Sequence, residues 1–209
     1  MIMYKTQIIC CIIVFFIAVF YFVSAKEKTK SHKWYSALLI VSFFQLIFDV
    51  LSIITVNNLD TIAPWINRLV HQGFMALMLA IFFVVYKYIE TVIEEEIGQR
   101  YKKMKWVYVP LFVSFFGVLI LPIHYMETPQ GNYSYGPGPI NIYISIAIYV
   151  ILITVMLFRY GRLLPRRIVR AIMVAMLSEA FIAGYQAFVP TALISCLGIT
   201  LLNLSFYLM

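Results

Sequence analysis

Long apolar runs with few charges limit what this chain can fold into more than any other feature. Between residues 64 and 90, four polar residues lie within two helical turns (Asn67, Arg68, His71 and Gln72), and an unbroken apolar run follows over 74–86. A helix that crosses a bilayer needs about 20 mostly apolar residues. Only 12% of the chain is charged, against roughly a quarter in a typical soluble domain. The sequence therefore predicts an integral membrane protein.

Apolar segments of this kind recur along the chain. We predict an all-α membrane protein: a single domain over residues 1–209 that forms a bundle of seven transmembrane helices. The first segment is longer than the apolar core of a signal peptide and precedes a basic stretch, so it is kept as a helix. The predicted helices cover 8–25, 34–56, 64–90, 107–124, 140–158, 168–188 and 191–209.

Basic residues are distributed unevenly between the two sides of this bundle. Of the 16 lysines and arginines, all except Lys5 and Arg68 fall at the end of the third helix or in the connections 26–33, 100–105 and 159–170, which share one side. Cytoplasmic connections carry the excess of positive charge. We therefore expect the N-terminus outside and the C-terminus inside. Topology and contact with anionic lipid account for the net charge of +7, so no nucleic-acid partner is expected.

Costly polar side chains gather in the outer half of the predicted bundle. On the second helix, Ser42, Gln45, Asp49 and Ser52 fall within about 80° of one another at 100° per residue. Ionisable residues inside a membrane usually face the bundle interior or water. The pattern predicts a polar cup open to the outside above an inner half of leucine, isoleucine, phenylalanine and valine. The candidate ligand-binding residues are Asp49, Arg68, His71, Gln72, Glu179, Tyr185 and Gln186.

Structural roles for the same residues are also open. Asp49 and Arg68 are equally compatible with a structural ion pair that locks the second predicted helix to the third. His71 is equally compatible with a satisfied interior histidine, and Glu179 with a protonated, hydrogen-bonded carboxyl group. The outer loop at 126–141 contains glycines and prolines that enforce turns. It is either a lid over the cup or an ordinary interfacial loop.

Sequence motifs of catalysis are absent. The chain has no metal-ligand spacing, no glycine-rich phosphate loop and no plausible pair of nucleophile and base. Its three cysteines, Cys10, Cys11 and Cys196, lie in apolar runs and suggest neither a disulfide nor a metal framework. We expect no enzyme activity, no catalytic residue, no metal and no cofactor.

Three segments carry a resemblance to a known class of protein. They are NYSYGPGPINIYIS at 132–145, RYGRLLPRR at 159–167 and SCLGITLLNLSFYLM at 195–209. With them the chain resembles the N-terminal multi-helix sensory module of bacterial membrane signalling proteins of the GGDEF diguanylate cyclase or histidine kinase type. The resemblance implies a role in signal transduction at the plasma membrane, with the last helix leading into a soluble output domain. That domain is expected to be absent from this chain, and no ligand residue follows from the resemblance.

The leading functional hypothesis is a receptor module that binds a small or amphiphilic ligand in the outer cup. A small transporter, or the substrate-binding subunit of one, is the alternative. It would need an inward path, for which Asn203 and Ser205 offer the support. An assembly subunit without a ligand is the third hypothesis. The expected partners are the lipid bilayer and an unidentified small-molecule or lipid-like ligand, with a homodimer as an option.

Overall fold

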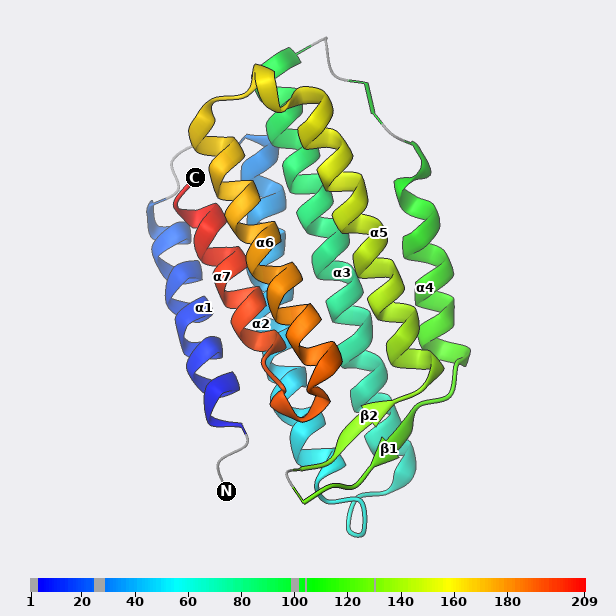
Figure 1. The fold of residues 1–209 in the computed structure, drawn as a ribbon. Helices are drawn as coiled ribbons and strands as arrows, with labels where there is room; N and C mark the ends of the chain where they lie inside the picture. Colours follow the sequence, from blue (N-terminus) through cyan, green and yellow to red (C-terminus); the bar gives the residue numbers. More distant parts are fainter. Residues whose placement is uncertain (1–3, 25–28, 99–101, 104, 130) are drawn as a thin grey trace.

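The chain folds as a bundle of helices that run alternately up and down (Figure 1). The structure is a computed structural model and describes residues 4–24, 29–98, 102–103, 105–129 and 131–209. Within these ranges the α-helices are α1 (Lys5–Ser24), α2 (Lys30–Val56), α3 (Pro64–Ile97), α4 (Tyr108–Ile120), α5 (Pro137–Tyr160), α6 (Arg166–Phe188) and α7 (Ser195–Tyr207). Short 3-10 helices, η2 (Lys105–Val107), η3 (Gly161–Leu163) and η4 (Pro190–Ala192), precede α4, α6 and α7.

The expected all-α fold is confirmed, and five of the helices are long and apolar enough to cross a membrane: α1, α2, α3, α5 and α6. This composition is consistent with a multi-pass membrane protein. The other two, α4 and α7, have 13 residues each, fewer than the about 20 that a spanning helix needs.

Several helix boundaries differ from the prediction for identifiable reasons. The helix predicted over 107–124 ends at Ile120, because Leu121 precedes Pro122 and is held in an extended conformation. His124 therefore lies in a strand rather than at a helix end. The helix predicted over 191–209 begins at Ser195, since Leu193 adopts a left-handed conformation with φ of 47°. At the other extreme, α3 continues past residue 90 to Ile97 and stops at Gly98, where φ is 59°.

A two-stranded hairpin replaces the irregular loop expected after α4. Strand β1 (His124–Met126) pairs antiparallel with β2 (Tyr133–Tyr135), with Tyr125 opposite Ser134. Pro137 then starts α5 at its first helical position, where the missing N–H has no cost. We call the end of the bundle that carries this hairpin the hairpin end.

The opposite end carries the basic connections, and we call it the basic end. The alternating helix directions bring the α1–α2, α3–α4 and α5–α6 connections together there (Figure 1). Lys26, Lys28 and Arg100 lie outside the described residues. The C-terminus also lies at the basic end, whereas the N-terminus lies at the hairpin end.

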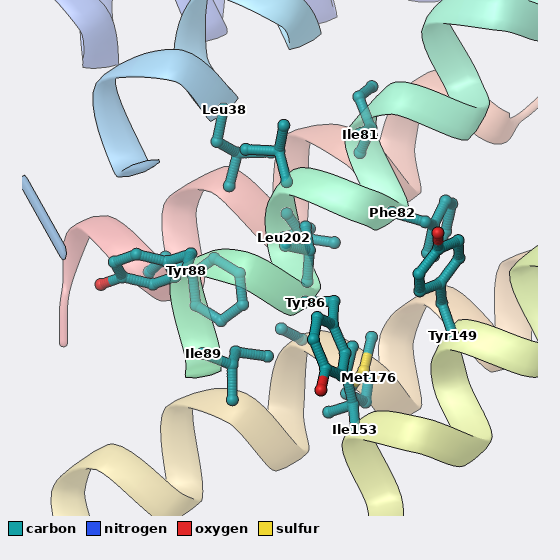
Figure 2. Close-up of a cluster of buried hydrophobic side chains, with 14 of the residues drawn as sticks. Leu38, Ile81, Phe82, Tyr86, Tyr88, Ile89, Tyr149, Ile153, Met176 and Leu202 are labelled. Atoms are coloured by element: carbon teal, nitrogen blue, oxygen red, sulfur yellow. The ribbon is translucent and has the colours of Figure 1, made fainter. Parts of the chain in front are cut away.

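The hydrophobic core is centred on α3. Phe82, Tyr86 and Ile89 of this helix are fully buried and face Tyr149 and Ile153 of α5 (Figure 2). Leu38 of α2, Met176 of α6 and Leu202 of α7 join the same cluster.

Helices at the periphery expose apolar side chains instead. Phe16 and Phe20 on α1 and Phe112 and Val113 on α4 are more than half exposed. An outer surface of this kind suits hydrocarbon better than water.

Candidate functional site

A cavity of about 110 Å³ lies near the hairpin end, between α2, α3, α5 and α6. Four of the seven candidate residues line it: Asp49, His71, Glu179 and Gln186. They come from three helices and lie at the depth at which the polar cup was predicted. The structure thus brings the two acidic side chains of the cup into one space.

Asp49 reaches this cavity from the polar face of α2. The residue is 3% exposed, and its Oδ2 has no hydrogen-bond partner among the described residues. Its backbone carbonyl accepts a hydrogen bond from Ser52 Oγ at 2.9 Å, but that contact does not involve the carboxyl group. Asp49 therefore lines the cavity and carries a buried carboxyl oxygen without a hydrogen-bond partner among the described residues.

Glu179 lies opposite, on α6, and is 5% exposed. Its Oε2 is likewise without a hydrogen-bond partner in the described part of the chain. Gly198 of α7 makes room for this carboxyl group, because a Cβ atom at that position would collide with Glu179 Oε2. The fully buried Ala175 lies one turn earlier on the same helix. Small residues on both helices therefore allow a bulky acid to fit between them.

Arg68 and Gln72 do not line the cavity but face α4. The Nη2 of Arg68 donates to the carbonyl of Leu119 at 3.4 Å, and Gln72 Nε2 donates to the carbonyls of Val118 and Leu119 at 3.1 and 3.2 Å. The last carbonyls of a helix have no partner within it. These two side chains supply partners to the end of α4, so the ion pair considered between Asp49 and Arg68 does not form.

His71 and Tyr185 differ in how they relate to the cavity. His71 lines it, and its Nδ1 is hydrogen-bonded to the carbonyl of Asn67 at 3.0 Å. The imidazole also packs edge-on against Tyr125 of β1, with 5.1 Å between ring centroids. Burial raises the pKa of the Tyr125 hydroxyl, so this group stays neutral. Tyr185 is 48% exposed and is not part of the lining.

The hairpin contributes cavity residues that were not among the seven candidate ligand-binding residues. Asn132, Tyr133 and Ser134 all line the cavity. Asn132 attaches the hairpin to the end of α2: its N–H donates to Asn57 Oδ1 at 3.2 Å, and its Nδ2 donates to the carbonyl of Val56 at 2.9 Å. The hairpin thus forms part of the cavity wall, a position that a lid would require.

Apolar side chains complete the wall. They belong to α2, α3, α5 and α6 and include Ile53, Met75, Met78, Ile142, Ile146 and Ile182. Nothing in the sequence separates such residues from lipid-facing ones, because both are apolar and helical. The cavity is therefore a small apolar pocket with acidic groups on two sides.

Among the described residues, no group of three histidine, cysteine, aspartate or glutamate side chains could hold a metal ion. Comparison with protein-family models, with curated proteins and with solved structures gave no significant match. The cavity and its lining residues are therefore the basis for inferring a function.

Proposed function

We propose that this protein is a seven-helix membrane receptor module that binds a small organic cation in the hairpin-end cavity. The observation that supports this proposal is the pairing of Asp49 and Glu179. Two buried carboxyl groups from different helices share one cavity, and each has an oxygen without a protein partner in the described residues.

Charge balance favours a cation as the ligand. An ionised carboxylate that is removed from water without a partner costs several kcal/mol. Arg68 is hydrogen-bonded to α4, and His71 already bonds a backbone carbonyl. A positively charged ligand compensates the acidic oxygens, and the rings of Phe74 and Tyr143 in the cavity wall add cation–π attraction.

The size of the cavity limits the ligand to a few non-hydrogen atoms. Its volume of about 110 Å³ is somewhat below that of an engineered cavity of roughly 150 Å³ that binds benzene. Methylated ammonium ions and short primary amines have suitable dimensions. Met75 and Met78 line the apolar side, and their flexible side chains adapt to the shape of a ligand.

The signal would pass to the basic end through α7. This helix packs against α6, α1 and α2, and Gly198 places it directly against Glu179. A ligand held between Asp49 and Glu179 would favour one packing of α2 and α6 over another, and α7 would follow. Such a shift requires that the ligand bind the two packings with different affinity. In the proposed topology the hairpin end faces the outside of the plasma membrane and the basic end faces the cytoplasm.

Thermal unfolding of the full chain in detergent micelles tests this proposal. We expect tetramethylammonium and methylammonium to raise the Tm, whereas tert-butanol and acetate leave it unchanged. A ligand at 100 times its Kd stabilises the folded state by about 2.7 kcal/mol. The D49N and E179Q variants should lose the response, and Tyr185→Phe, outside the cavity, should keep it. Equal stabilisation by the neutral alcohol, or an intact response in both acidic variants, would contradict the proposal.

Transport of the same ligand is the alternative function, and a flux measurement separates it from reception. Proteoliposomes that take up labelled methylammonium against protein-free controls would identify a transporter. Stabilisation without uptake identifies a receptor. If no cation stabilises the protein and none is taken up, the polar groups have only the structural role of specifying helix pairing.

A further inference from the structure

Buried polar side chains continue from the cavity towards the basic end, where an apolar interior was predicted. Gln45, Ser42 and Tyr35 follow Asp49 along α2, and Asn203 joins them from α7. All four are essentially inaccessible to solvent. Tyr35 and Asn203 are thus buried polar exceptions in the inner half, which was predicted to consist mainly of leucine, isoleucine, phenylalanine and valine. We call Asp49, Gln45, Ser42, Asn203 and Tyr35 the polar track.

Direct contacts join the inner members of the polar track. Asn203 Nδ2 donates to Ser42 Oγ at 2.9 Å, and the Tyr35 hydroxyl donates to the backbone carbonyl of Asn203 at 2.8 Å. Because the Ser42 oxygen accepts in this contact, the hydrogen of its hydroxyl group remains available to a further acceptor. These hydrogen bonds connect Ser42, Asn203 and Tyr35 from α2 to α7 and back, whereas Asp49 and Gln45 make no direct side-chain hydrogen bond with them.

Polar atoms that find no hydrogen-bond partner within the described part of the chain belong to the same set of residues. They are both side-chain heteroatoms of Gln45, the Oδ1 of Asn203 and the Oδ2 of Asp49. Leaving a buried donor or acceptor unpaired costs about 1–3 kcal/mol. In proteins such groups are normally satisfied by buried water. We therefore expect ordered water between the members of the track.

The spacing of the track suits single water molecules. Along a helix that rises 1.5 Å per residue, Asp49 and Gln45 are about 6 Å apart, and Gln45 and Ser42 about 4.5 Å. One water that makes two hydrogen bonds of about 2.8 Å bridges up to about 5.6 Å, and the side chains can reach the remainder. From Asp49 to Tyr35 the track covers about 21 Å of a hydrocarbon core about 30 Å thick.

The track ends, at Tyr35, at a second cavity of about 450 Å³ near the basic end. Tyr35, Tyr21, Tyr88 and His32 are among its lining residues. Tyr21 is hydrogen-bonded to His32, with 2.6 Å between the hydroxyl oxygen and Nδ1. Histidine is the side chain best suited to exchange protons with water near neutral pH. The track therefore has an acidic group at one end, and at the other it ends at Tyr35, beside a cavity whose lining includes the His32 imidazole.

We propose that the polar track conducts protons between the two cavities. A proton from the hairpin-end cavity binds the Asp49 carboxylate and then passes to water held by Gln45. The hydroxyl groups of Ser42 and Tyr35 each accept a proton and release their own, with water at Asn203 between them. The proton leaves through the His32 imidazole to the second cavity, so every group returns to its initial state.

The surroundings of the track fit a proton better than a larger ion. The Asn203–Ser42 contact closes the track to anything that needs a continuous channel. The titratable groups around Asp49 are Cys10 on α1, His71 on α3, Glu179 on α6 and Cys196 on α7. Tyr21, Tyr88 and Tyr207 surround Tyr35. None of these groups is a lysine or an arginine, so no permanently charged cation stands among them to repel an incoming proton.

Proton flux into liposomes tests this proposal. The full chain is reconstituted with a trapped pH-sensitive dye, and a potassium gradient with valinomycin drives proton entry. Wild-type vesicles should acidify faster than protein-free vesicles. Gln45→Leu and Ser42→Ala should lose this protein-dependent flux. Thr154→Ala is the matched control, because its exposed hydroxyl bonds only the carbonyl of Val150 on α5, and it should conduct like wild type.

Two results would overturn the proton path. One is a wild-type flux equal to that of protein-free vesicles, and the other is a wild-type flux in both track variants. Elution of each variant as a single species shows whether it folds. Should Gln45→Leu fail to fold, Ser42→Ala decides alone, since it removes a single oxygen atom. The flux is independent of any amine, so its loss leaves the cation-binding proposal untouched.

Discussion

The two ends of the bundle differ in whether their buried acidic side chains have a basic partner. At the basic end, Glu90 is 2% exposed but forms an ion pair with Lys87 on the next turn of α3. The ammonium group of Lys87 also lies 5.9 Å from the ring centroids of Trp34 and Tyr108. At the hairpin end, Asp49 and Glu179 are just as deeply buried, yet no basic side chain pairs with either of them in the described residues.

This contrast separates groups that hold the bundle together from groups that are free to bind. Further contacts at the basic end follow the same rule: Lys103 Nζ lies 2.9 Å from Glu94 Oε2, and Glu95 accepts the N–H of Ser31 in the first turn of α2. A carboxylate at that position also interacts favourably with the helix dipole. Removing a paired group should therefore cost stability, whereas neutralising an unpaired one should cost ligand response.

The largest loss of stability is expected from Glu90→Ala. The substitution leaves Lys87 with its charge buried and its ion-pair partner gone. Breaking a buried pair in this way costs roughly 3–5 kcal/mol. Unfolding by denaturant in micelles measures the free energy of unfolding, and D49N serves as the comparison. If D49N destabilises the protein as much as Glu90→Ala, the distinction between paired and unpaired acids fails.

A smaller but more specific effect is expected from Gly198→Ala. The new methyl group collides with the Glu179 carboxyl group, and such overpacking costs about 1–3 kcal/mol. The displaced carboxyl group should also weaken the Tm response to tetramethylammonium.

Gly184→Ala is the matched control, because a Cβ atom there meets nothing within 4 Å. It should stabilise α6 by about 0.5–1 kcal/mol through its better helix propensity. An equal loss of stability in both glycine variants would mean that Gly198 does not make room for Glu179.

Asn132→Ala tests the attachment of the hairpin. It removes the side-chain hydrogen bond to the carbonyl of Val56, at a cost of about 1 kcal/mol. Because the hairpin lines the cavity, a bound cation should dissociate faster from this variant. Asn58→Ala removes a similar 2.8 Å bond to Ile54 on the exposed side of α2. Its dissociation rate should match wild type, and a rate as fast as that of Asn132→Ala would argue against a lid.

The smallest effect is expected from Glu94→Gln at the water-exposed rim. Exposed ion pairs contribute about 0–1 kcal/mol and weaken in salt. Hydrogen bonding to Glu94 raises the pKa of Lys103. The contribution is therefore present at neutral pH and disappears as the pH rises through the raised pKa of the lysine. Denaturation of wild type and variant at low and high salt measures it, and a difference that grows with salt would be inconsistent with an ion pair.

Hydropathy and charge placement were sufficient to predict the helices and their alternating directions. Depth along each helix also placed Asp49, His71, Glu179 and Gln186 near one another, because residues at one depth and on interior faces must converge. What depth does not give is the direction in which a side chain turns. Arg68 and Gln72 lie at the same depth but face α4, and this depends on which helix packs beside α3.

The contacts that join the polar track were out of reach for a related reason, although Ser42, Gln45, Asp49 and Asn203 were each identified from the sequence as polar residues within predicted helices. Tyr35 is indistinguishable in the sequence from the many tyrosines of a membrane interface. Asn203 is an isolated amide in an apolar helix, and its contact with Ser42 joins residues far apart in the chain. The polar track therefore becomes visible only once α2 and α7 are placed side by side.

Infrared difference spectroscopy tests most directly whether Asp49 and Glu179 receive a cation in one cavity. Spectra of the full chain are recorded with and without tetramethylammonium. We predict that the cation perturbs two carboxyl bands, one of which is missing in D49N and the other in E179Q. An unchanged carboxyl region in the wild type, or the same two bands in both variants, would contradict a shared cation site.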